Sequence, residues 1–425
     1  MSRGSIADER LHELRHVVAS LNKLVGDRYE PSPLIAVYGE PVEPTYDSYA
    51  ACLDSLCEID AVIRELEDSQ RASFVREMVH AVSVFTRECV EQTRTYRQRV
   101  EAYAGVPGSP VPLSTIEAMQ RAVSGKLARL GIGGPMERAL ETWRLSQQID
   151  PSRLAERIEL LVGESRALAN RNILKVPVDC ALDVELVHGV FYQGYSEYHG
   201  NCRGTVRINA DLPWTNAGLK SLIAHEGYAG HFLLNAVSDE RARQGKLPPE
   251  SSFYFANTPN WPIIEGTCNM GVYLLGWFCD IHDEIQELLS RLRSALLINI
   301  AFLRHQDAAS DSEIVAAFTC GGFFSQEQAA QALRFIDHPL FHPSIPAYWH
   351  GTRVAFDALH VGLRTMSLQE VVNQLYRRGH TCATLGAWTA TQLPGDRDEH
   401  WILGETDERK GGGSIERHRK RQNGV

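Results

Sequence analysis

The 425-residue chain lacks the cysteine pattern of a metal ribbon or a disulfide framework. Its nine cysteines are odd in number and scattered, and no two of them form a CxxC pair. Small secreted domains usually carry even numbers of cysteines at close spacing, whereas cytosolic proteins keep their thiols reduced. We therefore expect reduced thiols and a cytoplasmic protein.

Long apolar runs are also missing. The N-terminus becomes charged and amphipathic within about ten residues, so it lacks the apolar core of a signal peptide. The most apolar stretch, 271–279, has only about half the length that a membrane helix needs. The sequence predicts a soluble protein that is not secreted and has no membrane partner.

The chain has no excess of positive charge. Its formal net charge is −10 at pH 7, which disfavours nucleic acid as a partner because a polyanion is bound by basic surfaces. The exception is the end of the chain, 406–425, where basic side chains follow three consecutive glycines. We expect this segment to be a flexible, solvated tail rather than a partner-binding arm.

Helical periodicity accounts for most of the remaining chain. Apolar residues recur at three- and four-residue spacing over 6–25, 47–103 and 136–170, as in amphipathic helices that pack in a bundle. Ser114 and Glu117 have the spacing of a capping box at the start of another helix. These patterns predict a mainly α fold.

The sequence pattern changes at about residue 173, where glycines begin to interrupt β-branched and aromatic residues. We expect two or three short strands within 173–179, 185–200 and 205–213. Helical patterns then return, and they include one long helix from Ile264 to about His305.

His225 and Glu226 are adjacent in the segment LKSLIAHEGYAGHFLL, and His231 follows them. Neutral imidazole is a zinc ligand, and a neighbouring carboxylate can hold the water that zinc acidifies. The commoner HExxH motif places its histidines four residues apart on one helical face, but here they are six apart. Six residues turn about 240° on a regular helix, so both rings can share a metal only if the backbone breaks between Gly227 and Gly230.

Glu265, in NTPNWPIIEG, is the best candidate for a third ligand, about forty residues downstream. Its carboxylate could equally cap a helix N-terminus, where negative charge is favoured. Cys268 is a softer alternative ligand, although a buried thiol is the simpler interpretation. Two imidazoles and a carboxylate suit Zn²⁺, with another divalent metal as the alternative.

These residues lie in segments that resemble, in order, a bacterial zincin-like family with an HExxPGH signature. The family is a domain of unknown function regarded as metallopeptidases. The resemblance covers about 184–363 and includes GYSEYHGNCRGTVRINADLP, IAHEGYAGHFL, NTPNWPIIEG, INIAFLRHQ and LRFIDHPLFHPSIPAYWHG. It implies a mainly α, zincin-like helical metallohydrolase fold with a short β-strand pair beside the metal-site helix. It also implies a divalent metal and hydrolysis of a peptide-like bond.

The resemblance assigns roles to the central residues. His225, His231 and Glu265 would be the metal ligands. Glu226 would be the general base that takes a proton from the attacking water.

Further residues would act on the substrate or support the ligands. Tyr348 would donate a hydrogen bond to the oxyanion, and His350 is a second candidate for that role. Asn269 and Asn299 match polar positions of the family and would orient the ligands, although ordinary hydrogen bonds between helices explain them nearly as well.

Tyr195, Tyr198 and His199 lie in the glycine-rich strand region. In zincins, a strand beside the active-site helix often binds extended substrate through its main chain, so these residues are candidates for a substrate site. Packing within a small sheet is an equal alternative.

Three residues depart from the family signature. Ala229 replaces a proline, Phe232 replaces a frequent second histidine, and Leu234 replaces a Glu or Gln. If the ligand were the second histidine of that pair, the metal site would be damaged. The changes otherwise indicate a shifted substrate.

The chain therefore divides into an N-terminal helical region at 1–170, a metal-site region at 171–405 that shares one core with the first, and the basic tail at 406–425. We expect a zinc-dependent hydrolase that acts on a peptide or small amide bond. Two alternatives stay open, namely a metal-dependent enzyme that transforms a small metabolite differently and a non-catalytic helical scaffold with a degenerate site. The substrate and the oligomeric state are also open.

Overall fold

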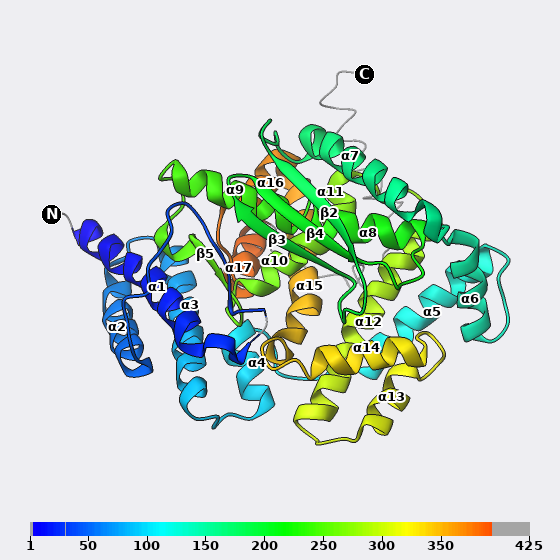
Figure 1. Ribbon diagram of the computed structural model, residues 1–425, viewed down its shortest axis with the longest axis horizontal. Coiled ribbons are helices and arrows are strands. Elements are labelled where there is room, and N and C mark those ends of the chain that lie inside the picture. Colours follow the sequence, from blue (N-terminus) through cyan, green and yellow to red (C-terminus); the bar gives the residue numbers. More distant parts are fainter. Residues whose placement is uncertain (1–2, 30, 393–425) are drawn as a thin grey trace.

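The computed structural model describes residues 3–29 and 31–392, so the basic tail at 406–425 lies outside the described residues. Most of the described chain is helical, which confirms the mainly α prediction (Figure 1). The helices are α1 Arg3–Val25, α2 Tyr49–Val62, α3 Ser69–Val90, α4 Tyr96–Ala104, α5 Leu113–Arg129, α6 Met136–Gln147, α7 Leu154–Asn172, α8 Asn216–Glu226, α9 His231–Arg243, α10 Trp261–Asn269, α11 Gly271–Leu275, α12 Ile281–His305, α13 Asp311–Thr319, α14 Gln326–Ile336, α15 Ile345–Thr365, α16 Leu368–Arg377 and α17 Cys382–Gln392.

The strands form two small sheets. β2 (Ala181–Val187), β3 (Gly194–Gly200) and β4 (Arg203–Asn209) have the order β2-β4-β3, with β4 parallel to β2 and antiparallel to β3. β1 (Leu34–Val37) pairs antiparallel with β5 (Phe253–Phe255). The three-stranded sheet lies at the centre of the molecule, and β3 packs against both α8 and α9 (Figure 1).

The N-terminal helices have a core of their own. Leu14 of α1, Leu56 of α2 and Met78 of α3 are almost fully buried in one cluster, which also includes Phe255 of β5. Burial of apolar side chains at three- and four-residue spacing is what holds such helices together. In Figure 1 these helices form the left side of the molecule.

A second, larger core surrounds α12, whose Leu288, Leu292 and Ile298 are fully buried. It includes residues from α4 to α17, and Ile264 of α10 packs against both cores. Glu265 therefore lies where the two cores meet. None of the described helices is both long and apolar enough to cross a membrane.

Several local predictions were wrong. Residues 173–179 form no strand, because the chain turns there before β2 begins at Ala181. The expected long helix from Ile264 to His305 is divided into α10, α11 and α12. It is interrupted at Gly276, whose φ of 76° is a left-handed conformation that favours glycine and ends α11.

The predicted capping box was also wrong. α5 begins at Leu113 with Pro112 as its N-cap, so Ser114 already lies inside the helix. The main-chain N–H of Thr115 bonds to the carbonyl of Pro112 at 3.0 Å, which starts the helix without a side-chain cap.

Cys180 and Cys202 form a disulfide, with their Cα atoms 4.6 Å apart. The expectation of reduced thiols is therefore wrong for this pair. Parallel pairing of β2 with β4 sets Ala181 opposite Arg203, and this brings together two cysteines that are 22 residues apart in the sequence. The other seven cysteines, all within the described residues, are free. The cytoplasmic location stays a prediction.

Candidate metal centre

A break in the backbone separates the two candidate histidines. α8 ends at Glu226 and α9 begins at His231, with a four-residue loop between them. Within the loop, the N–H of Gly230 donates to the carbonyl of Gly227 at 3.1 Å, and at the start of α9 the N–H of Leu234 donates to the carbonyl of Gly230 at 2.9 Å. The departure from helical geometry that the six-residue spacing demands is therefore present at the two glycines.

Gly230 allows the two ligand-bearing segments to approach. A Cβ atom on Gly230 would lie 1.6 Å from the carbonyl oxygen of His225 and 2.9 Å from that of Ala224. Only a residue without a side chain fits this contact. As a result, the ring centroids of His225 and His231 are 4.9 Å apart.

Glu265 of α10 faces both imidazoles. Its Oε2 lies 3.4 Å from Nε2 of His225, and its Oε1 lies 3.5 Å from Nε2 of His231. Ligand atoms that bind one tetrahedral zinc ion at about 2.1 Å are separated by about 3.4 Å, and each of these distances is close to that value, with one carboxylate oxygen facing each ring. Oε2 of Glu265 is buried without a hydrogen-bond partner, and a cation bound here would satisfy it. The residues present therefore fit a zinc ion.

Glu226 faces the same point from the end of α8. One oxygen of its carboxylate and one ring nitrogen from each of the two histidines all lie within 4.8 Å of one another. The Glu226 side chain is buried. These three side chains could themselves hold a cation, and the part of Glu226 as the residue that holds the attacking water is what the family resemblance implies.

Charges within this group reinforce one another. Burial would lower the pKa of His225 and His231, but the carboxylates of Glu265 and Glu226 outweigh it and raise both pKa values to about 9. Burial would likewise raise the pKa of Glu265, but the two imidazoles lower it to about 2. The site therefore favours positive charge next to a carboxylate, as a cation site does.

Asn269, at the end of α10, orients His225. Nδ1 of His225 lies 2.9 Å from Oδ1 of Asn269, an acceptor, so Nδ1 carries a proton and Nε2, which faces Glu265, is the nitrogen that would lose its proton to bind a metal. Nδ2 of Asn269 donates to Oγ1 of Thr352 at 2.7 Å, and that hydroxyl donates to the carbonyl of Tyr348 at 2.6 Å. This chain of hydrogen bonds sets the tautomer that ligation through Nε2 requires.

We expect Asn269→Ala to weaken metal binding about 10- to 100-fold, the usual effect of removing such a support. Competition with a chromophoric chelator measures this change. Asn299→Ala is the control, because Asn299 exchanges two hydrogen bonds with the main chain of Val111, at 2.7 and 3.0 Å. The control should lower stability and leave metal affinity unchanged. Equal metal affinity in the two variants would contradict the role given to Asn269.

Tyr348 approaches the site because α10 and α15 are in backbone contact. A Cβ atom on Gly266 of α10 would lie 2.2 Å from the carbonyl oxygen of Gly351 in α15. Burial, together with the negative charges of Glu265 and Glu226, raises the pKa of Tyr348 well above its usual value. The hydroxyl therefore keeps its proton and can act as a hydrogen-bond donor.

His350 and Asn299 are not brought to the metal site. His350 follows Tyr348 by two residues in α15, which places it about 200° around the helix. Burial and the charge of Arg353 lower its pKa to about 4. Asn299, in α12, forms hydrogen bonds with the main chain of Val111. It therefore has the ordinary structural role that was the alternative to orienting a metal ligand.

Of the three strand residues, only Tyr195 lies close to the site. Burial raises its pKa to about 12, and the charges of Glu197 and Glu226 contribute. The hydroxyl of Tyr198 instead donates to Oδ2 of Asp239 at 2.7 Å, which ties β3 to α9.

His199 also has a structural partner. Its Nε2 lies 2.9 Å from the hydroxyl of Thr205, so it links β3 with the neighbouring strand β4. The packing alternative therefore describes Tyr198 and His199.

The structure shows where the residues that depart from the family signature lie. Phe232 is fully buried and packs edge-on against Tyr228, with ring centroids 5.2 Å apart, so it points into the core. His231, and not the residue after it, faces the proposed ligands. The carbonyl of Ala229 accepts a hydrogen bond from Tyr376 at 2.5 Å. Leu234 lines a pocket.

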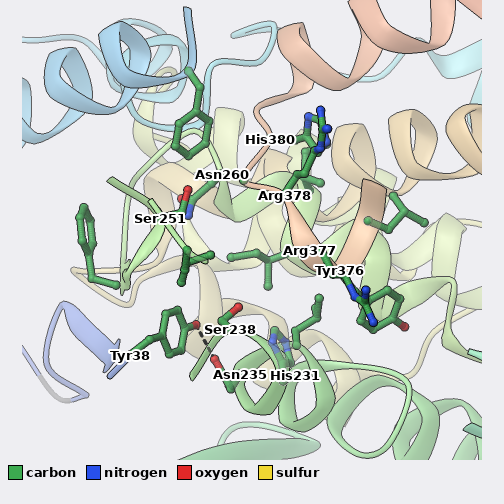
Figure 2. Close-up of a pocket in the computed structure, with 18 residues that line it drawn as sticks. Tyr38, His231, Asn235, Ser238, Ser251, Asn260, Tyr376, Arg377, Arg378 and His380 are labelled. Carbon is green, nitrogen blue, oxygen red and sulfur yellow. Dashed lines mark hydrogen bonds between the residues drawn. The ribbon is translucent and has the colours of Figure 1, made fainter. Parts of the chain in front are cut away.

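This pocket opens beside His231 and has a volume of about 70 Å³ (Figure 2). Figure 2 shows His231 and Asn235 of α9 at the bottom, Arg378 and His380 at the top, and Arg377 beside Tyr376 between them. Arg377, Arg378 and His380 could not be predicted from the sequence, because the pocket is formed by segments far apart in the chain and these residues belong to no motif.

Comparison with known proteins finds similar structures but no family. No family model matches the chain, and no curated protein matches it. A solved structure described as "the putative lipoprotein from Colwellia psychrerythraea" is similar with a TM-score of 0.55 and 15% identity, over 84% of this chain and 70% of that chain. A second, "a putative lipoprotein of unknown function from Shewanella oneidensis", gives 0.49 and 13%, over 80% and 75%. The first likeness shows a shared fold alone, and the zincin-like resemblance stays a prediction.

Proposed function

We propose that this protein is a zinc-dependent hydrolase of a peptide or small amide bond. The observation that carries the proposal is the convergence of His225, His231 and Glu265, with one oxygen of the Glu265 carboxylate buried and unpaired. Two imidazoles and one carboxylate are the protein ligands of many catalytic zinc sites.

Each side chain at the metal centre has a separate role in the proposed hydrolysis. A zinc ion held by His225, His231 and Glu265 would supply a Lewis acid that lowers the pKa of water. Glu226 accepts a proton from the attacking water and passes it to the leaving nitrogen. Tyr348 donates a hydrogen bond to the carbonyl oxygen as negative charge develops on it.

The arrangement of elements also supports a zincin-like site. β3 is an edge strand of its sheet and packs against α8 and α9, the helices that carry the histidines. An extended peptide can add to such an edge by main-chain hydrogen bonds, with its scissile bond near the helix.

Elemental analysis of protein purified without added metal tests the proposal. We expect about one zinc per chain, in line with a single three-ligand site, and loss of that zinc in His231→Gln. His199→Gln is the matched control, because His199 lies outside the ligand set and pairs with Thr205. Absence of metal would contradict the proposal and favour the scaffold. Bound metal without hydrolysis across a broad panel of amides would favour a different transformation of a small metabolite.

A further inference from the structure

The pocket beside His231 has apolar walls. No Asp or Glu is among the described residues that line it. Its apolar side chains come from α3, α9, α10, α16 and the segment around β5, and they include Phe74, Leu234, Leu247, Phe253, Ile263, Ile264 and Leu375. A pocket of this kind favours an apolar group of a ligand.

One side of the pocket is basic. Arg377 and Arg378, at the end of α16, both line it and are exposed. Within 3–29 and 31–392, no carboxylate forms an ion pair with either of them or with Arg241. Burial, together with the positive charges of Arg377 and Arg378, lowers the pKa of Arg241. This end of the pocket attracts an anion.

His380 adds an unused polar group. Its side chain is 3% exposed and lines the pocket, yet neither ring nitrogen has a hydrogen-bond partner among the described residues. Burial and the charge of Arg378 lower its pKa to about 4, so its ring is neutral and keeps one N–H donor. The carbonyl of Gln374 opposes that shift but does not reach hydrogen-bond geometry. A buried donor without a partner is rare in folded proteins and indicates a ligand atom.

The basic end is held in a fixed relation to the metal centre. The hydroxyl of Tyr376, the residue before Arg377, donates to the carbonyl of Ala229 at 2.5 Å. Ala229 lies in the loop between α8 and α9, two residues before His231. One ligand that fills the pocket can therefore reach both His231 and the arginines.

We propose that the pocket binds an apolar residue of the substrate together with its free carboxylate, which Arg377 and Arg378 hold by charge-assisted hydrogen bonds. The substrate class is an N-acyl amino acid or the C-terminal residue of a peptide. This inference rests on the proposed hydrolysis at the metal centre. Water adds to the amide carbon, the C–N bond breaks, and the proton from water goes to the amine, so no further reactant is needed.

Two matched thiols test the proposal on the zinc-loaded protein. 2-Benzyl-3-sulfanylpropanoic acid has a thiol for zinc, an apolar ring and a carboxylate, and its carboxamide lacks only the negative charge. We expect titration calorimetry to show the acid binding about tenfold tighter than the carboxamide or more, the usual gain from a charge-assisted hydrogen bond. The double variant Arg377→Gln, Arg378→Gln should lose this preference while binding the carboxamide as before.

The control is the double variant Arg129→Gln, Arg138→Gln, which removes two exposed positive charges from α5 and α6, outside the pocket. It should keep the preference for the acid. Equal binding of the two thiols by the wild-type protein would overturn the carboxylate pocket and leave the metal centre standing, because both thiols still bind. If the double variant Arg377→Gln, Arg378→Gln still bound the acid more tightly than the carboxamide, the carboxylate pocket would likewise be overturned and the metal centre would stand. Failure to bind zinc and both thiols would overturn the proposed function, and this inference with it.

Discussion

Replacing Glu226 by Gln is expected to keep the fold and the metal and to reduce turnover at least about a hundredfold, the scale of a lost general base. The amide has nearly the same shape as the carboxylate, and the side chain is buried at the end of α8, so packing is preserved. The amide cannot accept a proton from water. Turnover and zinc content measured on the same preparation check both parts of the prediction.

Glu185→Gln serves as the control for Glu226→Gln. Glu185 lies on β2, where its carboxylate is exposed and pairs with Arg207 at 3.1 Å. This substitution should leave turnover within about a factor of two, because an exposed ion pair contributes little free energy. Near-normal turnover of Glu226→Gln would remove Glu226 from the mechanism. Loss of zinc from that variant would show that Glu226 is a ligand instead.

The helical part of the fold could be predicted because its signal is local. The periodicity over 6–25 corresponds to α1, and that over 136–170 covers α6 and α7. The strand pair β1 and β5 could not be predicted in the same way. Each of its strands is only three or four residues long, and the partners are more than 200 residues apart. Pairing at that range leaves no trace in a single sequence.

The metal centre could be predicted in part, because the spacing of its two histidines in the sequence is unusual. The six-residue interval between His225 and His231 demands a break, and the glycines within it are where the break occurs. Polar residues were harder to assign, because their partners come from distant segments. Tyr198 bonds to Asp239 and Asn299 bonds to Val111, and neither partner can be read from local sequence.

The departures at Phe232 and Leu234 affect different parts of the molecule. Phe232 belongs to the core beneath the sheet, where a Cβ atom on Gly204 would lie 2.9 Å from its ring. Leu234 lines the pocket and adds to its apolar wall. Only the change at Leu234 can therefore affect a ligand in this pocket directly.

Gly230→Ala is expected to weaken metal binding more than about a hundredfold, beyond the effect of losing a supporting residue. The new Cβ atom would overlap the carbonyl oxygen of His225, so the loop must open and carry His231 away from Glu265. The distance of 3.5 Å between those side chains cannot survive this movement. Zinc affinity and turnover should fall together, and chelator competition measures the first.

Gly163→Ala separates this effect from the general effect of an added methyl group. Gly163 is an exposed residue within α7, and a Cβ atom there would meet nothing within 4 Å. Alanine in a helix interior is favoured over glycine by about 1 kcal/mol, so this variant should be slightly more stable and bind zinc normally. If Gly230→Ala also bound zinc as the wild-type protein does, the two histidines would not need the close approach at Gly230. A shared metal at His225 and His231 would then have to be abandoned.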